Sequence, residues 1–334
     1  METAAHTVTR PVISLRYDLQ AAPGGPGHAE LVAAMLDQVA YADQHGLDRV
    51  VVSEHHHTTD GYLPSVFVAL AAIAARTSRV RIRPSALILP LHDPVRIAED
   101  SAVLDLISGG RLDLAVAAGY REVEFAMLGK NFGNRGTRLR RAVKFLREAW
   151  SGERCFFEGR PVLVRPLPAT PGGPPIIMGG STPKTARRAA EIADGYDPAR
   201  PELLGEYRRI CAELGRNPGE CLPRVGPFFL FVTEDPERAR HRLTPHVHHV
   251  VSQYAAWSAE SGHVDAAPGR TLARVWDSDA YQVVTPAEAI KLLRGDRSGG
   301  LLTLNPLCGG LPPELANDSL RLFVEKVLPA LGGS

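Results

Sequence analysis

A strand that runs directly into acidic and imidazole side chains is the first feature of this sequence that could do chemistry. Residues 49–52 (Arg-Val-Val-Val) have the composition of a buried strand, and residues 53–57 (Ser-Glu-His-His-His) follow it. In a barrel of parallel strands, the carboxyl ends of the strands carry the catalytic groups. Alternation along an extended chain places His55 and His57 on one side and Glu54 and His56 on the other. These side chains could bind a metal, move protons or only hydrogen-bond.

A metal centre at this strand end would need further ligands from later strands. The later strand ends supply residues 117–119 (Ala-Ala-Gly), residues 178–180 (Met-Gly-Gly), Thr233 and Asn305, and none of these is a convincing ligand for a catalytic metal. We therefore expect no metal ligands at the site. A metal-dependent hydrolase built on His55 and His57 is kept as a less favoured alternative.

A second candidate site passes from a strand into a helix at residues 178–183 (Met-Gly-Gly-Ser-Thr-Pro). Glycine lets a backbone approach a ligand closely, and a serine or threonine followed by proline is typical of a helix start. Free N–H groups at the positive end of a helix attract anions. This pattern predicts a phosphate site at Gly179, Gly180, Ser181 and Thr182, with an ordinary capped helix that binds nothing as the alternative.

Small residues at two further strand ends leave room for a flat ligand. Pro84-Ser85-Ala86-Leu87 interrupts the third predicted strand, and residues 117–120 (Ala-Ala-Gly-Tyr) end the fourth. A bulge required by Pro84 is an alternative explanation of the first segment. Core packing is an equally good explanation of Tyr120.

The elements that must position these residues alternate between strand-like and helix-like segments. Strands are predicted at 12–17, 49–53, 80–89, 111–117, 174–178, 225–232 and 301–304, and helices at 28–45, 64–76, 94–108, 138–150, 183–193, 202–214 and 313–331. About eight strand–helix units favour an α/β fold of the (β/α)₈ TIM-barrel type over an open sheet. We expect one domain over residues 1–334, with insertions at about 151–174 and 235–280.

Two local signals fix element boundaries. Asp93-Pro94 begins a helix that Gly109-Gly110 ends. Glu158-Gly159 is the predicted turn of a hairpin within residues 155–166, inside the first insertion.

Composition excludes several classes of function. The chain has 334 residues, 44% of them hydrophobic and 22% charged, and a formal net charge of +1, so no basic surface for nucleic acid is expected. Four widely spaced cysteines without CxxC spacing indicate reduced thiols. No apolar run reaches membrane-spanning length, and residues 1–10 carry no apolar leader. We therefore expect a cytoplasmic protein without a membrane partner.

Taken in order, the motifs resemble those of the bacterial luciferase-like flavin-dependent oxidoreductases, which are (β/α)₈ barrels. The matching pieces cover most of the chain. They are residues 53–56 (SEHH), 89–100 (LPLHDPVRIAED), 104–111 (LDLISGGR), Gly119-Tyr120 with Glu124-Phe125, 179–181 (GGS) and 320–323 (LRLF).

The resemblance implies specific roles at the mouth of the barrel. A flavin ring would lie there against a non-proline cis peptide, at Ser85–Ala86 or Ala86–Leu87, and beside Ala118, Gly119 and Tyr120. The flavin phosphate would bind at Gly180, Ser181 and Thr182, next to Gly179. His55 would act in catalysis, because an imidazole can serve as acid or base near neutral pH. His56 is expected to be structural, and the role of His57 stays open.

The resemblance also implies cofactor and partners. Many flavin-mononucleotide (FMN) members have an arginine where this chain has Ala118, so backbone N–H groups, Lys184 or Arg187 would meet the phosphate charge here. We expect a two-component monooxygenase that uses reduced FMN from a separate flavin reductase, dioxygen and a small organic substrate, with the chain as a homodimer. The main alternative is hydride transfer with the 5-deazaflavin coenzyme. A catalytically silent flavin-binding relative is a further alternative.

Overall fold

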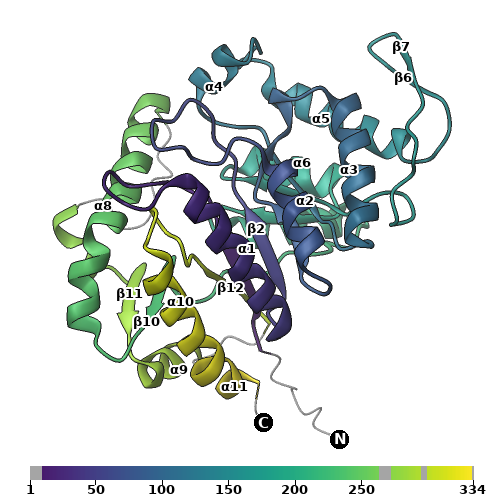
Figure 1. Cartoon of the computed structure of the whole chain (residues 1–334). Helices are drawn as coiled ribbons and strands as arrows, with labels where there is room; N and C mark the ends of the chain where they lie inside the picture. Colours follow the sequence, from purple (N-terminus) through teal and green to yellow (C-terminus); the bar gives the residue numbers. More distant parts are fainter. Residues whose placement is uncertain (1–9, 263–271, 295–298, 333–334) are drawn as a thin grey trace, which may run out of the picture.

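Eight short parallel segments form the centre of the molecule (Figure 1). A computed structural model describes residues 10–262, 272–294 and 299–332. The strands of the centre are β1 (Val12–Tyr17), β2 (Arg49–Val52), β3 (Arg81–Pro84), β4 (Leu87–Ile88), β5 (Leu114–Ala117), β8 (Ile176–Gly180), β9 (Gly195–Pro198) and β12 (Leu301–Leu304).

Hydrogen bonding arranges these strands in two four-stranded parallel sheets, in the orders β12-β1-β2-β3 and β4-β5-β8-β9. On one side, a parallel bridge from Ile82 to Leu112 joins the two sheets. On the other side, the segment 220–224 lies between them, with bridges from Gly195 to Glu220 and from Arg224 to Leu301. The ring of strands is therefore of the TIM-barrel type that the alternation of strands and helices predicts.

Helices surround this ring (Figure 1). The longer ones are α1 (His28–Gln44), α2 (Val66–Arg76), α3 (Pro94–Ser108), α5 (Arg135–Ala149), α6 (Pro183–Ile192), α7 (Leu203–Glu213), α8 (Pro236–Ser261), α9 (Pro286–Arg294) and α10 (Pro313–Leu322). Shorter turns are η1 (Leu89–Leu91), α4 (Glu122–Met127), η2 (Leu272–Asp277), η3 (Phe323–Val327) and α11 (Leu328–Leu331). None of the helices described is both long enough and apolar enough to span a membrane.

Helix α3 shows how local chemistry sets an element. The Asp93 side chain accepts a hydrogen bond from Val95 N at 2.9 Å, and Pro94 occupies the first turn. Gly109 ends the helix with a φ of 64°, a conformation that residues with a Cβ rarely adopt. The predicted start and end of this helix are confirmed.

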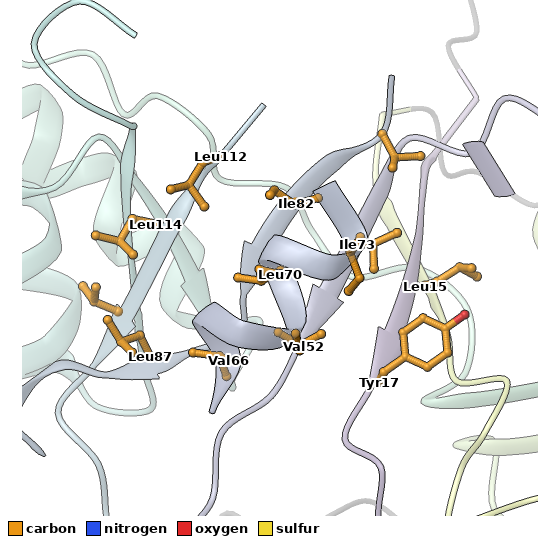
Figure 2. Close-up of a cluster of buried hydrophobic side chains, with 14 of the residues drawn as sticks. Leu15, Tyr17, Val52, Val66, Leu70, Ile73, Ile82, Leu87, Leu112 and Leu114 are labelled. Carbon is orange, nitrogen blue, oxygen red and sulfur yellow. The ribbon is translucent and has the colours of Figure 1, made fainter. Parts of the chain in front are cut away.

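The core lies between the strands and the helices that cover them. Figure 2 shows Val66, Leu70 and Ile73 of α2 packed toward β-strand residues that include Val52 and Ile82. Full burial of one such side chain stabilises a protein by about 1.5–3 kcal/mol. This packing holds β2 firmly, and β2 carries the residues at positions 53–57.

The amino end of the barrel interior holds an ion-pair network that the sequence did not reveal. Arg49 Nη2 bonds Glu220 Oε2 at 2.7 Å, while Arg83 Nη2 bonds Asp113 Oδ2 at 2.9 Å and Glu220 Oε1 at 2.8 Å. Both arginines are almost fully buried. Arg49 opens β2 and His55 follows its end, so this network supports the barrel at the end away from the histidines.

The insertions differ from the prediction in detail. β6 (Cys155–Phe157) and β7 (Arg160–Val162) form the expected antiparallel hairpin, with its turn at Glu158-Gly159. The predicted strand at 225–232 is shorter, β10 (Phe229–Val232), and it pairs with an unpredicted strand, β11 (Tyr281–Val284). The region expected to be irregular and mostly helical is one 26-residue helix, α8, up to Ser261. Residues 263–269 of that expectation lie outside the described residues.

The interruption predicted in the third strand is present, because Ser85 and Ala86 leave the ladder and separate β3 from β4. Some other element boundaries were predicted wrongly. Helix α5 begins at Arg135, three residues before the predicted start. The predicted final helix, 313–331, contains the π-helical turn η3.

Candidate active site

His55 lies just beyond the end of β2, with only 7% of its surface exposed. Its Nδ1 is 2.7 Å from Glu124 Oε1, and its Nε2 is 3.5 Å from the Tyr120 hydroxyl. A carboxylate accepts a hydrogen bond from Nδ1–H, which leaves Nε2 able to accept a proton on the side of the ring that Tyr120 faces. The geometry therefore fits an acid or base at His55.

Glu124, on α4, is the hub that positions His55. The same Oε1 also accepts from His56 N and from Arg121 Nη1, both at 3.2 Å. Arg121 Nη1 donates as well to His56 O at 2.9 Å, so the loop after β2 is fixed at three points. Glu124 is fully buried, and its Oε2 has no hydrogen-bond partner among the described residues. The sequence had marked Glu124 only as part of a motif, without this role.

Four aromatic rings surround the His55 imidazole. The ring centroids of Tyr62 and Trp257 lie 4.7 Å from it, that of Tyr120 at 5.6 Å and that of Tyr254 at 6.3 Å. Burial raises the pKa values of all three tyrosines, which therefore keep their protons at neutral pH.

Two of these rings come from α8, inside the second insertion. These two rings are Tyr254 and Trp257. Trp276, Val250 and Val251 pack with the β10–β11 pair in a separate core cluster, which Tyr254 also contacts.

Glu54 and His56 point away from this cage and form a second polar cluster with His92. Glu54 Oε1 accepts from His56 Nε2 at 2.9 Å and from His92 Nε2 at 2.7 Å. Burial alone would raise the pKa of Glu54, but the two imidazole hydrogen bonds outweigh it and lower that pKa to about 2. His56 thus makes the structural contact expected of it.

The structure offers a different set of possible metal ligands from His55 and His57, on which the metal hypothesis was based. His55 is buried against Glu124, and His57 is exposed with a φ of 53°. Glu54, His56 and His92 do have ligand atoms within 4.8 Å of one another. The two hydrogen bonds to Glu54 satisfy this cluster, and we assign it a structural role.

The residues predicted to face a flat ligand lie beside this cage. The cis peptide is Ser85–Ala86, the first of the two predicted positions, and Ser85 N donates to Val52 O at 2.7 Å. Ala118 is partly exposed. Gly119 has a φ of 77°, and a Cβ there would lie 2.6 Å from an Ile88 side-chain carbon, so only glycine fits.

The predicted phosphate loop opens α6 as expected, but part of its donor capacity is used within the chain. Thr182 Oγ1 accepts from Thr185 N at 3.3 Å, and Thr182 N donates to Thr185 Oγ1 at 3.1 Å. Pro183 has no N–H. An anion at Gly179–Thr182 therefore depends more on nearby side chains than the sequence suggested.

Two arginines that the sequence did not single out meet near this loop. Arg135 Nε donates to Gly119 O at 3.2 Å. The Nη2 atom of Arg188, on α6, lies 2.8 Å from the position that a Cβ atom would take at Gly136. The Nε atom of Arg188 is buried and has no hydrogen-bond partner among the described residues. Burial lowers both pKa values, and for Arg188 nearby Arg140 and Arg135 lower it further. Neither Lys184 nor Arg187, both exposed, shows such an arrangement.

A TIM-type barrel with a buried histidine–glutamate pair just beyond the end of β2 is an arrangement that suits an enzyme. The model of the luciferase-like monooxygenase family matches residues 13–295. The chain therefore belongs to that family, and it is an oxidoreductase.

The proteins similar to this chain include F420-dependent and flavin-dependent enzymes. The chain is 31% identical to the F420-dependent glucose-6-phosphate dehydrogenase of Rhodococcus erythropolis, over 96% of this chain and 98% of that one. The match to the enzyme of that name from Nakamurella multipartita spans 57% of each chain at 32% identity. The oxygenase component of the flavin-dependent trigonelline monooxygenase of Acinetobacter baylyi is 26% identical over 54% of each chain.

Solved structures show the same fold. Monooxygenase RslO1 from Streptomyces bottropensis superposes with a TM-score of 0.76 at 25% identity, over 95% of this chain and 98% of that one. The FMN complex of the oxygenating constituent of 3,6-diketocamphane monooxygenase from Pseudomonas putida gives 0.73 at 17% identity, over 96% and 99%.

Proposed function

We propose that this protein is the oxygenase component of a two-component monooxygenase, which uses reduced FMN and dioxygen on a small organic substrate. The observation that carries the proposal is His55, held by Glu124 and enclosed by four aromatic rings. A site that excludes water protects reactive species from hydrolysis and strengthens electrostatic interactions. The likeness to RslO1 over nearly the whole chain supports this choice.

The residues present fit a phosphorylated flavin. The orphaned Nε of Arg188, with Arg135 beside it, offers donors for a phosphate next to Gly179, Gly180, Ser181 and Thr182. Ser85, Ala86, Ala118, Gly119 and Tyr120 would lie along the ring. When bound, the reduced flavin supplies the two electrons that dioxygen chemistry requires.

The chain's own contribution is to hold and move a proton at His55 Nε2. Glu124 keeps the other ring nitrogen protonated and stabilises the imidazolium that forms when Nε2 takes up a proton. Arg121 and the His56 amide keep that carboxylate in place. Tyr254 and Trp257 keep water from the ring.

A second candidate is hydride transfer with a 5-deazaflavin coenzyme, without dioxygen. Two observations favour it. Ala118 stands where many FMN members have arginine, and the relatives of highest identity given above are F420-dependent dehydrogenases.

Partners follow from the same proposal. Reduced flavin would come from a separate reductase in the cytoplasm. Helices α2 and α3 pack against each other, and both leave apolar side chains exposed. These exposed side chains support a homodimer. These are Val68, Val103, Leu106 and Ile107.

The deciding experiment is a titration of the purified protein with FMN, riboflavin and the deazaflavin coenzyme, followed by turnover with and without dioxygen. We expect FMN to bind better than riboflavin, and Arg188→Gln to remove about tenfold of that preference by deleting a charge-assisted contact. The exposed Arg187→Gln is the matched control. Tight deazaflavin binding with turnover that ignores dioxygen would favour the second candidate and refute the first.

His55→Ala tests the catalytic assignment. Cofactor affinity should stay within a few-fold, while turnover falls by about 100-fold or more, as for loss of a general acid or base. His57→Asn is the control because His57 is exposed and asparagine tolerates a positive φ. A His55→Ala protein with normal turnover would remove His55 from the mechanism.

A further inference from the structure

A cationic side chain, Arg16 of β1, lies in the wall of the aromatic cage. Its Nε donates to Ser53 Oγ at 3.0 Å, and its Nη2 donates to the Tyr254 hydroxyl at 2.8 Å and the Tyr62 hydroxyl at 3.2 Å. Tyr62 and Tyr254 are also two of the rings around His55. The guanidinium is thus one aromatic ring away from the candidate catalytic imidazole.

This cluster has more hydrogen-bond donors than acceptors. The two hydroxyl oxygens lie 3.0 Å apart, so one hydroxyl donates to the other while both accept from Arg16. The proton of the second hydroxyl then has no acceptor within the cluster. None of the hydrogen bonds that Arg16 makes with the described residues uses Nη1, which carries two more protons. Within this part of the chain, three donors therefore remain for an acceptor from outside.

The positive charge has no carboxylate at hydrogen-bond distance among the described residues. The nearest carboxylate oxygen belongs to Asp18 and lies 3.9 Å from Arg16 Nη2, so this ion pair leaves the donors of the guanidinium unused. The opposite face of the guanidinium meets the Phe228 ring at 5.6 Å. The Arg16 side chain keeps 16% of its surface exposed, so a ligand can reach it.

We propose that Arg16, together with the Tyr62 and Tyr254 hydroxyls, binds the carboxylate of an aromatic or heteroaromatic acid and so selects the substrate class of this enzyme. A carboxylate can accept a charge-assisted hydrogen bond from Arg16 Nη1 through one oxygen and the surplus phenolic proton through the other. The flat rings of the cage suit an aromatic body, whose reactive carbon would lie beside His55. This assignment rests on the proposed function, because it takes His55 as the reacting end of the site.

The test is calorimetric binding without cofactor, using benzoate against benzamide and nicotinate against nicotinamide. Each pair has nearly the same shape and differs in charge. We expect the acids to bind at least tenfold more tightly than their amides. Arg16→Gln should weaken acid binding by about tenfold or more and leave amide binding within twofold, since hydrogen bonds to charged groups are among the stronger ones.

Further variants separate recognition from folding. Arg16→Lys keeps the charge and should retain part of the preference, and Tyr254→Phe removes a hydroxyl and should cost about threefold to tenfold. Arg76→Gln, an exposed arginine on α2, is the matched control and should change nothing. If both Arg16 variants fail to fold, the preference of Tyr254→Phe decides.

The outcomes are distinguishable from those of the proposed function. Equal binding of acids and amides, binding of neither, or an acid preference that survives in Arg16→Gln and Tyr254→Phe would overturn the carboxylate site. Arg16→Gln should bind FMN as the unsubstituted protein does. If the protein discriminates between acid and amide but binds neither FMN nor deazaflavin, the carboxylate site stands and the proposed function falls.

Discussion

Replacing Glu124 by glutamine isolates the contribution of its charge, because the amide oxygen can keep the place of Oε1. Three donors converge on that atom, from His55, His56 and Arg121, so the oxygen rather than the amide nitrogen should face them. The hydrogen-bond geometry and the His55 tautomer are then preserved. What is lost is the negative charge in a fully buried position.

The loss can be sized from the distance between Arg121 Nη1 and Glu124 Oε1, which is 3.2 Å. At an effective dielectric constant near 20, this pair attracts with about 5 kcal/mol, and desolvation offsets part of that. Removing one partner of a buried pair costs about 3–5 kcal/mol. Because glutamine keeps an acceptor, we expect about 3 kcal/mol, or roughly 4 °C in melting temperature for a chain of this size.

Activity should fall as well. The proton that His55 Nε2 takes up loses its stabilising carboxylate, so we expect kcat to drop about 10- to 100-fold while the Michaelis constant changes little. Thermal unfolding followed by circular dichroism and steady-state turnover measure the two effects. Glu122→Gln, an exposed acid on the same helix, is the control. If Glu124→Gln and Glu122→Gln have the same melting temperature and the same turnover, Glu124 does not position His55 in the way described.

Three further substitutions test other parts of the structure. Glu54→Gln should lower the unfolding free energy at pH 7 by about 3 kcal/mol. The pKa of Glu54 is lowered from 4.5 to about 2 in the fold, so this stabilisation is present above pH 4.5 and is lost toward pH 2. Urea unfolding of both proteins at pH 7 and pH 2 should show the difference shrinking in acid. Arg83→Met should cost about 1.5–3 kcal/mol, because Asp113 and Glu220 each lose a charge-assisted hydrogen bond while Asp113 keeps Arg81 and Glu220 keeps Arg49. Arg81→Met, at a half-exposed position, should cost less. Asp60→Asn should weaken the 2.9 Å pair with His249 and speed hydrogen exchange across α8, whereas unchanged exchange there would show that the pair does not anchor the helix.

The sequence predicted best those features that a few adjacent residues decide. Asp93-Pro94 and Gly109 set a helix start and end through one side-chain cap and one positive φ. Glu158-Gly159 set a hairpin turn through two positive φ values. The histidines after β2 were singled out because polar side chains at the end of a buried strand have no ordinary packing role, and the catalytic role of His55, which the family resemblance implies, stays a prediction.

What the sequence did not predict depends on contacts between distant residues. Glu124 is 69 positions from His55, and Glu220 is 171 positions from Arg49, so no local pattern joins either pair. Strand β9 reads Gly-Tyr-Asp-Pro, which is typical of a turn, and it becomes a strand only because β8 offers it a ladder. In each case the hydrogen bond, ion pair or strand pairing that decides the structure forms only when the chain folds into the barrel.

The same distance argument explains why α8 matters to the site. This helix provides Tyr254 and Trp257, two rings of the cage, and it is tied to the barrel by polar contacts on both sides of them. His249 bonds Asp60, and Glu260 reaches Arg121 at 3.3 Å, the residue that steadies Glu124. Trp257 also covers the Arg121 guanidinium at 4.6 Å. In the proposed function, substrate contact and support of the His55–Glu124 pair come from one helix, so changes in α8 that alter specificity should also change the setting of His55.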